Sequence, residues 1–353
     1  MILGADVRNT RIAVHASSAA MSGPKLGGSI EIDFFGGYNG SSAFSDEQPL
    51  PRLRLAYADL VWSRTSVRIG QAFTPIAGVV PSSPTHVAFP LGFGSAGWIG
   101  WRHPGVFVTH QFTGGAQGDM KLSGQVGAFR GSWSGPGNVL DAGSAGEAGS
   151  PQFEGRLELA SGTRWSAFVA GHWDRKDISA AGVDSTSSVD GSAVTVGGRT
   201  AVGVFTVQGG GYVGRAIGQQ MGMLTQFGDI GGRGGWLQAG VTFRPGWSAW
   251  LFRGVDDPDD ADVLREVAGN ARLRNDLAAL SVQYSPGPWT AGMEWTRAST
   301  RWAADGAGDS RNSANQLTFS LIYRFSTDAP PAVAAADDRT SVTRTSGTGK
   351  KLP

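Results

Sequence analysis

The sequence contains no cysteine, which excludes disulfide bonds, thiolate metal sites and a cysteine nucleophile. Charged residues make up only 17% of the 353 positions, below the roughly 25% of ordinary soluble proteins. The net charge of +1 does not favour a nucleic-acid partner, which a strongly basic chain would. No stretch approaches the roughly 18–20 apolar residues of a membrane helix. These absences exclude a disulfide scaffold and a bundle of membrane helices.

Lysine is also rare, and the first residues of the sequence do not have the pattern of an export signal. Only five of the 30 basic residues are lysine, so the positive charge is mostly arginine. The start, MILGADVRNTR, lacks the apolar core of a signal peptide, because Asp6 and Arg8 come too early.

Glycine and period-two alternation are abundant instead. The 54 glycines are about twice the usual share of ~7%. In QLTFSLIYRF (316–325), Leu317, Phe319 and Leu321 alternate with Thr318 and Ser320. This is the pattern of a strand with one apolar and one polar face.

The same alternation predicts fifteen strands. Most of them have the ~9–11 residues that a tilted strand needs to cross a bilayer. The predicted strands span residues 7–16, 26–38, 52–62, 66–73, 98–112, 119–131, 152–160, 163–174, 191–200, 203–213, 235–244, 247–254, 273–285, 288–299 and 315–325.

The connections between these strands alternate in length. Short ones are 63–65, 114–118, 161–163, 244–246 and 285–288, and long ones are 39–51, 74–97, 132–151, 175–190, 214–234, 255–272 and 300–314. Short turns at one end and long loops at the other are typical of outer-membrane barrels. Twelve Trp residues lie near predicted strand ends, Trp98 and Trp236 among them, as interfacial aromatic girdles would.

We therefore predict an all-β, antiparallel transmembrane β-barrel over residues 1–326. The alternative is a soluble, Gly-rich β protein whose apolar faces pack together. Residues 327–353 are rich in Pro and Ala, then in Ser, Thr, Lys and Arg, which predicts a disordered tail.

The strand count itself leads to a further expectation. A sheet that spans lipid must close, because every backbone group needs a partner there. With fifteen antiparallel strands the first and last run in the same direction. We expect a further strand and a signal peptide upstream of Met1, lost from this chain by N-terminal truncation.

Several ordered motifs resemble one family. DVRNTRIAVHA, GGSIEIDFFG, LPRLRLAYADLVW and RIGQAFTP come first, and GVDDPDD, RLRNDLAALSVQYSPGPWTAGMEW and LTFSLIYRF follow later. Over residues 5–325 this order resembles the DcaP-like trimeric porins of Gram-negative outer membranes, which are related to phosphate-selective porins. The resemblance implies a barrel of sixteen strands, a homotrimer in outer-membrane lipid, and passage of small, often anionic solutes. Phe325 resembles the terminal aromatic residue read by the barrel-assembly machinery.

Residues on the polar face of the strands are candidates for a lumen. Arginine binds carboxylate and phosphate through a planar fork, and rings of arginine favour anions in pores. Alternatively, these arginines pair with carboxylates such as Glu154 and Glu158 and only fill the wall. The pore-lining candidates are Arg11, Glu31, Asp33, Arg52, Arg54, Arg68, Arg156, Arg164, Arg199, Arg244 and Arg324.

The loop at 74–97, TPIAGVVPSSPTHVAFPLGFGSAG, is too apolar to extend into water. We predict that it folds into the barrel as a constriction loop, with trimer packing as the alternative. The candidate constriction residues are Pro75, Pro84, His86, Phe89 and Phe93.

Other motifs give little indication of chemistry. GFGSAG (92–97) fits G-x-G-x-x-G, but no strand–helix unit surrounds it. DDPDD (256–260) is either a divalent-cation ligand set or, as we favour, an acidic solvated loop. No catalytic, cofactor or metal motif emerges. The predicted function is a passive porin with an Arg-lined, water-filled lumen for small anionic solutes; a non-channel barrel, enzyme or adhesion scaffold, is the alternative.

Overall fold

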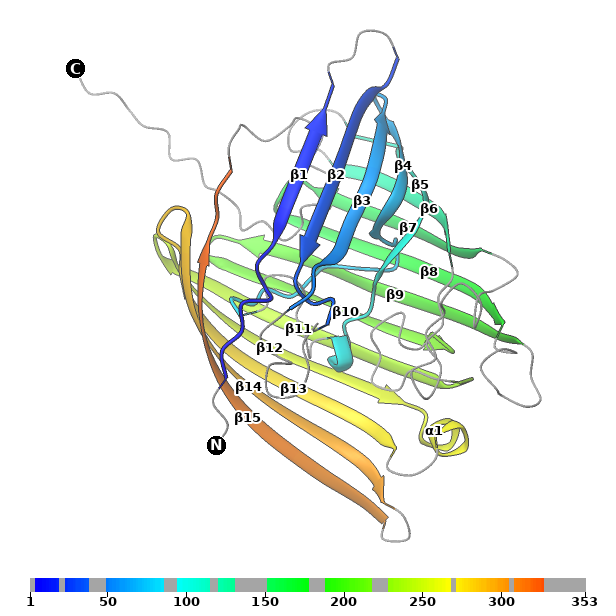
Figure 1. Cartoon of the computed structure of the whole chain (residues 1–353), viewed down its shortest axis with the longest axis vertical. Helices are drawn as coiled ribbons and strands as arrows, with labels where there is room; N and C mark the ends of the chain where they lie inside the picture. Colours follow the sequence, from blue (N-terminus) through cyan, green and yellow to red (C-terminus); the bar gives the residue numbers. More distant parts are fainter. Residues whose placement is uncertain are drawn as a thin grey trace.

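One antiparallel sheet of fifteen strands makes up the molecule, and each strand pairs with its neighbours in the sequence. Figure 1 shows the sheet curling around the cyan segment between β4 and β5. The computed structural model describes residues 4–18, 23–37, 49–85, 94–114, 120–130, 151–177, 188–217, 228–267, 271–304 and 308–326.

All fifteen predicted strands are present, with shifted ends. The strands are β1 Ile12–Ser17, β2 Lys25–Asp33, β3 Arg52–Val61, β4 Thr65–Phe73, β5 Arg102–Gln111, β6 Met120–Phe129, β7 Gln152–Ser161, β8 Trp165–Asp177, β9 Ser188–Val202, β10 Phe205–Arg215, β11 Gly231–Arg244, β12 Trp247–Pro258, β13 Arg272–Tyr284, β14 Trp289–Ala304 and β15 Gly308–Tyr323. A short 3-10 helix, η2, spans Gly94–Ala96.

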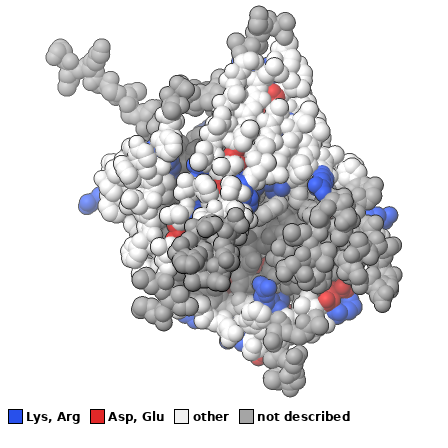
Figure 2. Space-filling view, viewed as in Figure 1, with Lys and Arg blue, Asp and Glu red and all other residues white. Residues whose placement is uncertain are grey.

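The two faces of the sheet have opposite polarity. On β15, Phe319 and Leu321 each leave 71% of their surface exposed, whereas Glu294, on the opposite face of neighbouring β14, is 2% exposed. Figure 2 shows few charged atoms on the outer face of β1–β3. An apolar exterior around a polar interior is the reverse of a soluble protein and is the arrangement of a transmembrane β-barrel.

The ends of the sheet remain a separate question. An odd number of antiparallel strands places β1 and β15 in the same direction. Within the described residues no backbone ladder joins these two strands. The predicted upstream strand therefore stays a prediction.

Aromatic side chains ring the outer surface at the end of the sheet where the turns are short. Trp247 stacks on Tyr284 with ring centroids 4.6 Å apart, and Trp289 contacts Tyr323 at 4.5 Å. This agrees with an interfacial girdle. Trp98 and Trp236 do not belong to it, because they are 1% and 7% exposed and lie in an interior cluster.

The long connection after β12 contains a short helix, α1 (Asp260–Glu266). The Asp259 side chain caps it by accepting from the N–H of Asp262 at 3.0 Å. Asp262 accepts from the N–H of Gly231 at 3.0 Å, and this bond, with the Arg265 guanidinium, lowers the pKa of Asp262 below its ordinary value. The prediction of a solvated loop at DDPDD (256–260) is thus wrong, since Asp256 to Pro258 complete β12 and Asp259 caps α1. Within the described ranges no helix combines the length and apolar character needed to cross a membrane.

Candidate functional site

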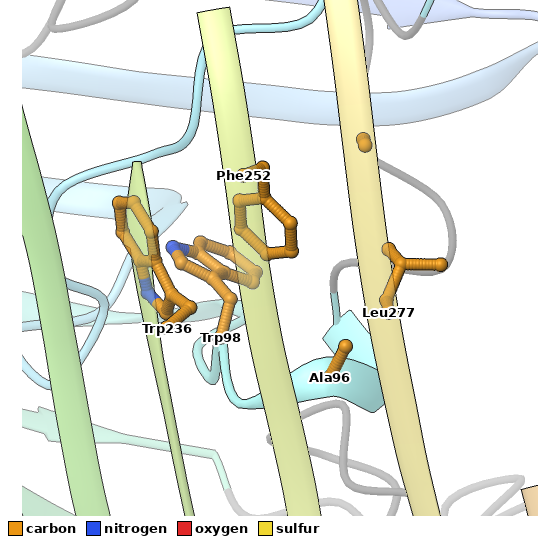
Figure 3. Packing of buried hydrophobic residues seen from close by; sticks show 6 residues of the cluster. Ala96, Trp98, Trp236, Phe252 and Leu277 are labelled. Atoms are coloured by element: carbon orange, nitrogen blue, oxygen red, sulfur yellow. The ribbon is translucent and has the colours of Figure 1, made fainter. Parts of the chain in front are cut away.

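The segment between β4 and β5 lies inside the barrel. Its two ends meet, with the N–H of Thr74 donating to the carbonyl of Trp101 at 3.1 Å. Trp98 is buried between Trp236 and Phe252 of the wall, as Figure 3 shows. The indole N–H of Trp98 donates to the carbonyl of Val79 at 2.8 Å, which ties the two described halves of the segment together.

Glycines allow this segment to approach the wall closely. Gly97 has a φ of +94°, and an added Cβ there would overlap the backbone of Gly235 on β11. A Cβ on Gly254 of β12 would overlap the carbonyl oxygen of Ala96. Larger residues would push the segment away from the sheet.

The first half of the segment, 74–85, is anchored by polar side chains from distant strands. The N–H of Ile76 donates to Glu154 of β7 at 2.8 Å. Gln238 of β11 makes two bonds of 2.7 Å with the backbone of Ser82. At its far end Thr85 donates to Glu294 of β14 at 2.6 Å. The segment therefore crosses the interior from β7 to β14.

Arg156, a predicted lumen residue, is one of these anchors. Its guanidinium donates to the carbonyl of Ala77 at 2.9 Å and lies 3.9 Å from the ring centroid of Phe168. It also pairs with Glu158 at 2.9 Å. The side chain thus fixes the loop rather than extending into open water.

Sequence reasoning placed Glu154, Arg156 and Glu294 on the lumen face but did not single out the other residues that hold the segment. Gln208 donates to the carbonyl of Val80 at 3.4 Å and to Gln238 at 2.8 Å. Buried His172 lies 3.0 Å from Glu154, beneath the start of the segment. These residues occupy polar-face positions of their strands, which was the only signal available for them.

The arginines of β3 and β4 are paired with carboxylates. Arg54 contacts Glu31 at 2.5 Å and Asp33 at 3.1 Å. Arg52 pairs with Asp33 at 2.6 Å. Asp33 is completely buried. This cluster is the arrangement expected if these arginines fill the wall.

Two further predicted residues join similar pairs. Arg68 donates to Asp59 at 2.8 Å and lies 3.7 Å from the ring centroid of Tyr57. Arg11 is 3.4 Å from Glu31. Both guanidiniums therefore have an acidic neighbour.

The remaining predicted arginines gather near the short-turn end of the barrel. Arg164 lies in the turn before β8 and donates to the hydroxyl of Ser161 at 3.1 Å. Arg324, just after β15, donates to the hydroxyl of Thr290 at 2.8 Å. Arg199 on β9 and Arg244 at the end of β11 have no carboxylate partner within the described residues. Among the described residues, Arg199 and Arg244 thus place positive charge at this mouth without a paired carboxylate.

Two groups of predictions need separate mention. Pro75 and Pro84 are both buried in the inserted segment, whereas His86, Phe89 and Phe93 lie outside the described residues. The carboxylates of DDPDD have protein partners: Asp256 accepts from the hydroxyl of Tyr212 and Asp260 pairs with Arg301 at 2.7 Å. Among the described residues no cluster of His, Asp and Glu suits a metal ion.

Comparisons with known proteins agree on the fold. No family model matches the sequence, and no curated protein matches it. The outer membrane channel DcaP of Acinetobacter baumannii superposes with a TM-score of 0.68 at 18% identity, covering 90% of this chain and 85% of that one. OmpT, an outer membrane protein of Vibrio cholerae in its trimer form, gives 0.54 at 11% identity, covering 89% and 91%. The predicted likeness to DcaP-like porins is thus confirmed at the level of the fold.

Proposed function

We propose that this protein is an outer-membrane porin of a Gram-negative bacterium through which small hydrophilic solutes diffuse. The observation that carries the proposal is that the described parts of the segment between β4 and β5, residues 74–85 and 94–101, fold into the barrel and are held by side chains of the inner wall. A loop in this position would reduce the cross-section of the lumen without blocking it. An apolar exterior around a polar interior fits passive conduction across a membrane.

The inserted segment is the proposed constriction. Pro75 and Pro84 stiffen its path, because proline fixes φ. Pro84 lies directly over Gly292 of β14, where a larger residue would collide with it. The segment therefore narrows the lumen at a fixed height.

An anion preference rests on fewer residues than the sequence suggested. Arg54 and Arg68 are neutralised by buried carboxylates, so their contribution to the potential in the lumen is small. Arg199 and Arg324, with Arg164 and Arg244 nearby, surround the short-turn mouth. A positively charged mouth raises the local concentration of anions.

Assembly and lipid contact complete the proposal. DcaP is a channel and the Vibrio OmpT was obtained as a trimer, which supports a homotrimer here. The exposed apolar bands on the strands would contact outer-membrane lipid. Phe325, 76% exposed and stacked near Tyr323, is the proposed signal for the barrel-assembly machinery.

Single-channel recording in planar bilayers tests this function. We expect discrete conductance steps, and in a salt gradient a reversal potential that indicates anion preference. Replacing Arg199 and Arg324 by Gln should shift the reversal potential toward zero. Arg175→Gln, on the outer wall, is the matched control and should leave it unchanged.

Two results would contradict the proposal at different levels. Absence of conductance from correctly folded protein would favour the non-channel barrel. A cation preference in the unaltered protein would contradict the proposed anion preference but would still be consistent with a porin.

A further inference from the structure

The outer wall of β11–β15 has an unusual set of charges near the long-loop end. Arg233, Arg253, Arg274, Arg297 and Arg311 all lie on the face that carries exposed apolar side chains elsewhere. We refer to these five residues as the outer arginine patch. Their strands are the yellow and orange ones of Figure 1, with β11 beside them.

The sheet register places the patch directly above the apolar band. Arg253 on β12 and Arg297 on β14 are both opposite Ala278 of β13, so only a methyl group lies between them. One step nearer the membrane centre, Leu280 pairs with Leu251 and Trp295. These three side chains are 49%, 59% and 38% exposed. The guanidiniums therefore lie at the boundary of the lipid-facing surface.

Carboxylates are too few to neutralise the patch. Asp276 is shared by Arg253 at 2.8 Å, Arg274 at 3.1 Å and Arg311 at 3.6 Å. Within the described residues, Asp257 is the only acidic partner of Arg233, at 3.4 Å. Five arginines thus surround two carboxylates.

The most exposed members of the patch can reach a ligand. The side chains of Arg233, Arg253 and Arg311 are 78%, 64% and 61% exposed. Arg297 is exposed and has no acidic partner in the part of the chain that the structure describes. Neighbouring Arg301 does not add to the excess, because Asp260 and Asp309 pair with it.

An apolar groove of about 630 Å³ adjoins the patch. Val194, Val196 and Val213 line it and are 49%, 52% and 61% exposed. Arg233, Arg274 and Asp257 also line it. The surface thus combines an apolar groove that can bind a hydrocarbon chain with guanidinium groups that can bind an anion.

We propose that the patch and groove bind one anionic lipid of the outer leaflet, with its phosphate on the arginines and an acyl chain along the valines. Guanidinium forks match phosphate oxygens, and basic clusters at a membrane surface attract anionic headgroups. The long loops mark the outer leaflet side. The proposal requires membrane insertion but does not depend on solute passage.

Binding to purified protein in a neutral detergent tests the proposal. The probes are phosphatidic acid, phosphatidylcholine with the same acyl chains, and inorganic phosphate, measured by native mass spectrometry. We expect phosphatidic acid to bind at least about tenfold more tightly than phosphatidylcholine, since charge-assisted bonds to phosphate supply the difference. Inorganic phosphate should bind weakly, because it cannot use the groove.

Variants distinguish the patch from general surface charge. Arg253→Gln with Arg297→Gln should weaken phosphatidic acid binding at least about tenfold. Arg175→Gln is the matched control, because Arg175 is exposed on β8 and pairs with Asp190 at 2.6 Å. Heat-modifiable gel mobility establishes that each variant is folded.

Several outcomes would overturn the proposal. Equal binding of both lipids, or an unaffected double variant, would remove the phosphate site. Full competition by millimolar inorganic phosphate would identify a free-anion site instead of a lipid site. A change in subunit number in the double variant would identify the patch as a contact between copies of this chain.

Discussion

Arginines on the inner face of β3 and on the outer face of β12 lie in opposite surroundings. Arg54 leaves 3% of its side chain exposed and contacts two carboxylates. Arg253 is 64% exposed and, within the described residues, pairs with Asp276, which two other arginines share. The same residue type therefore builds the wall in one region and presents unneutralised charge in the other.

This difference shows what decides the role of an arginine in a barrel. In the buried cluster each carboxylate removes the charge of its neighbour from the lumen, and geometry holds the pair. At the outer boundary water screens the pairs, so they contribute little to stability. Unneutralised guanidiniums there remain available to a ligand.

The largest expected effect comes from Arg54→Met. Loss of this partner leaves Glu31 and Asp33 insufficiently neutralised in a buried position, which should lower the free energy of unfolding by about 3–5 kcal/mol. Urea unfolding in detergent, followed by tryptophan fluorescence, measures it. Arg253→Gln is the control and should change stability by less than about 1 kcal/mol. Equal losses of stability in the two variants would show that burial does not determine how much these arginines contribute to stability.

A smaller effect is expected from Arg156→Gln, which removes charge-assisted bonds to the inserted segment. Each such bond contributes about 1.5–3 kcal/mol, and its loss should let the segment fluctuate. Single-channel traces should show added current noise. Arg199→Gln, which lies on the inner face but has no bond to the segment in the described residues, should leave the noise unchanged. Noise in both variants would mean that Arg156 does not anchor the loop.

Strand number and face were predictable because lipid imposes a strict period-two pattern. The ends were not. β14 was predicted to end at 299 but continues to Ala304, because Thr300 and Arg301 interrupt the apolar alternation at that point. β5 begins at Arg102 rather than 98, since Trp98 turns inward with the loop. Helix α1 has seven residues, too few for a helical period to emerge.

For the candidate site, the sequence predicted only which residues lie on the inner face of the strands, and not their partners. Alternation places Arg54 and Glu31 on the inner side but does not say which carboxylate a long side chain reaches. The loop was recognised from its apolar composition. Its anchors were not, because Gln238 is 156 residues from Ser82 in the chain. Contacts at that separation depend on strand register and loop path, which a single sequence does not encode locally.

A third effect concerns Asp262, which lies on α1 outside the membrane and accepts from Gly231, Arg265 and Arg215. Its pKa is lowered by the Gly231 N–H first and by the guanidiniums. Its stabilisation is therefore present above the ordinary Asp pKa of about 3.9 and is lost as the pH falls through the lowered value. The protection factors of the α1 amides, which correct hydrogen exchange for the intrinsic dependence of its rate on pH, should be lower at pH 3 than at pH 7.

The variant Asp262→Asn should show the lower protection factors already at pH 7 and lose this dependence of the protection factors on pH. Asp190→Asn, on the exposed pair with Arg175, provides the control and should leave α1 unchanged. If α1 stays equally protected in all samples, the guanidiniums near α1 behave like those of the outer patch and not like Arg54.

The smallest effect on stability is expected from Asp257→Asn. Asp257 lies 3.4 Å from Arg233 and 3.5 Å from Arg274, and exposed pairs of this kind contribute about 0–1 kcal/mol. Urea unfolding should therefore be nearly unchanged. Lipid binding should respond in the opposite direction to Arg253→Gln, because the substitution removes one of the two carboxylates in the patch. Tighter phosphatidic acid binding with unaltered stability would show that Asp257 affects binding through its charge alone. Weaker binding would show that Asp257 holds the arginines in place.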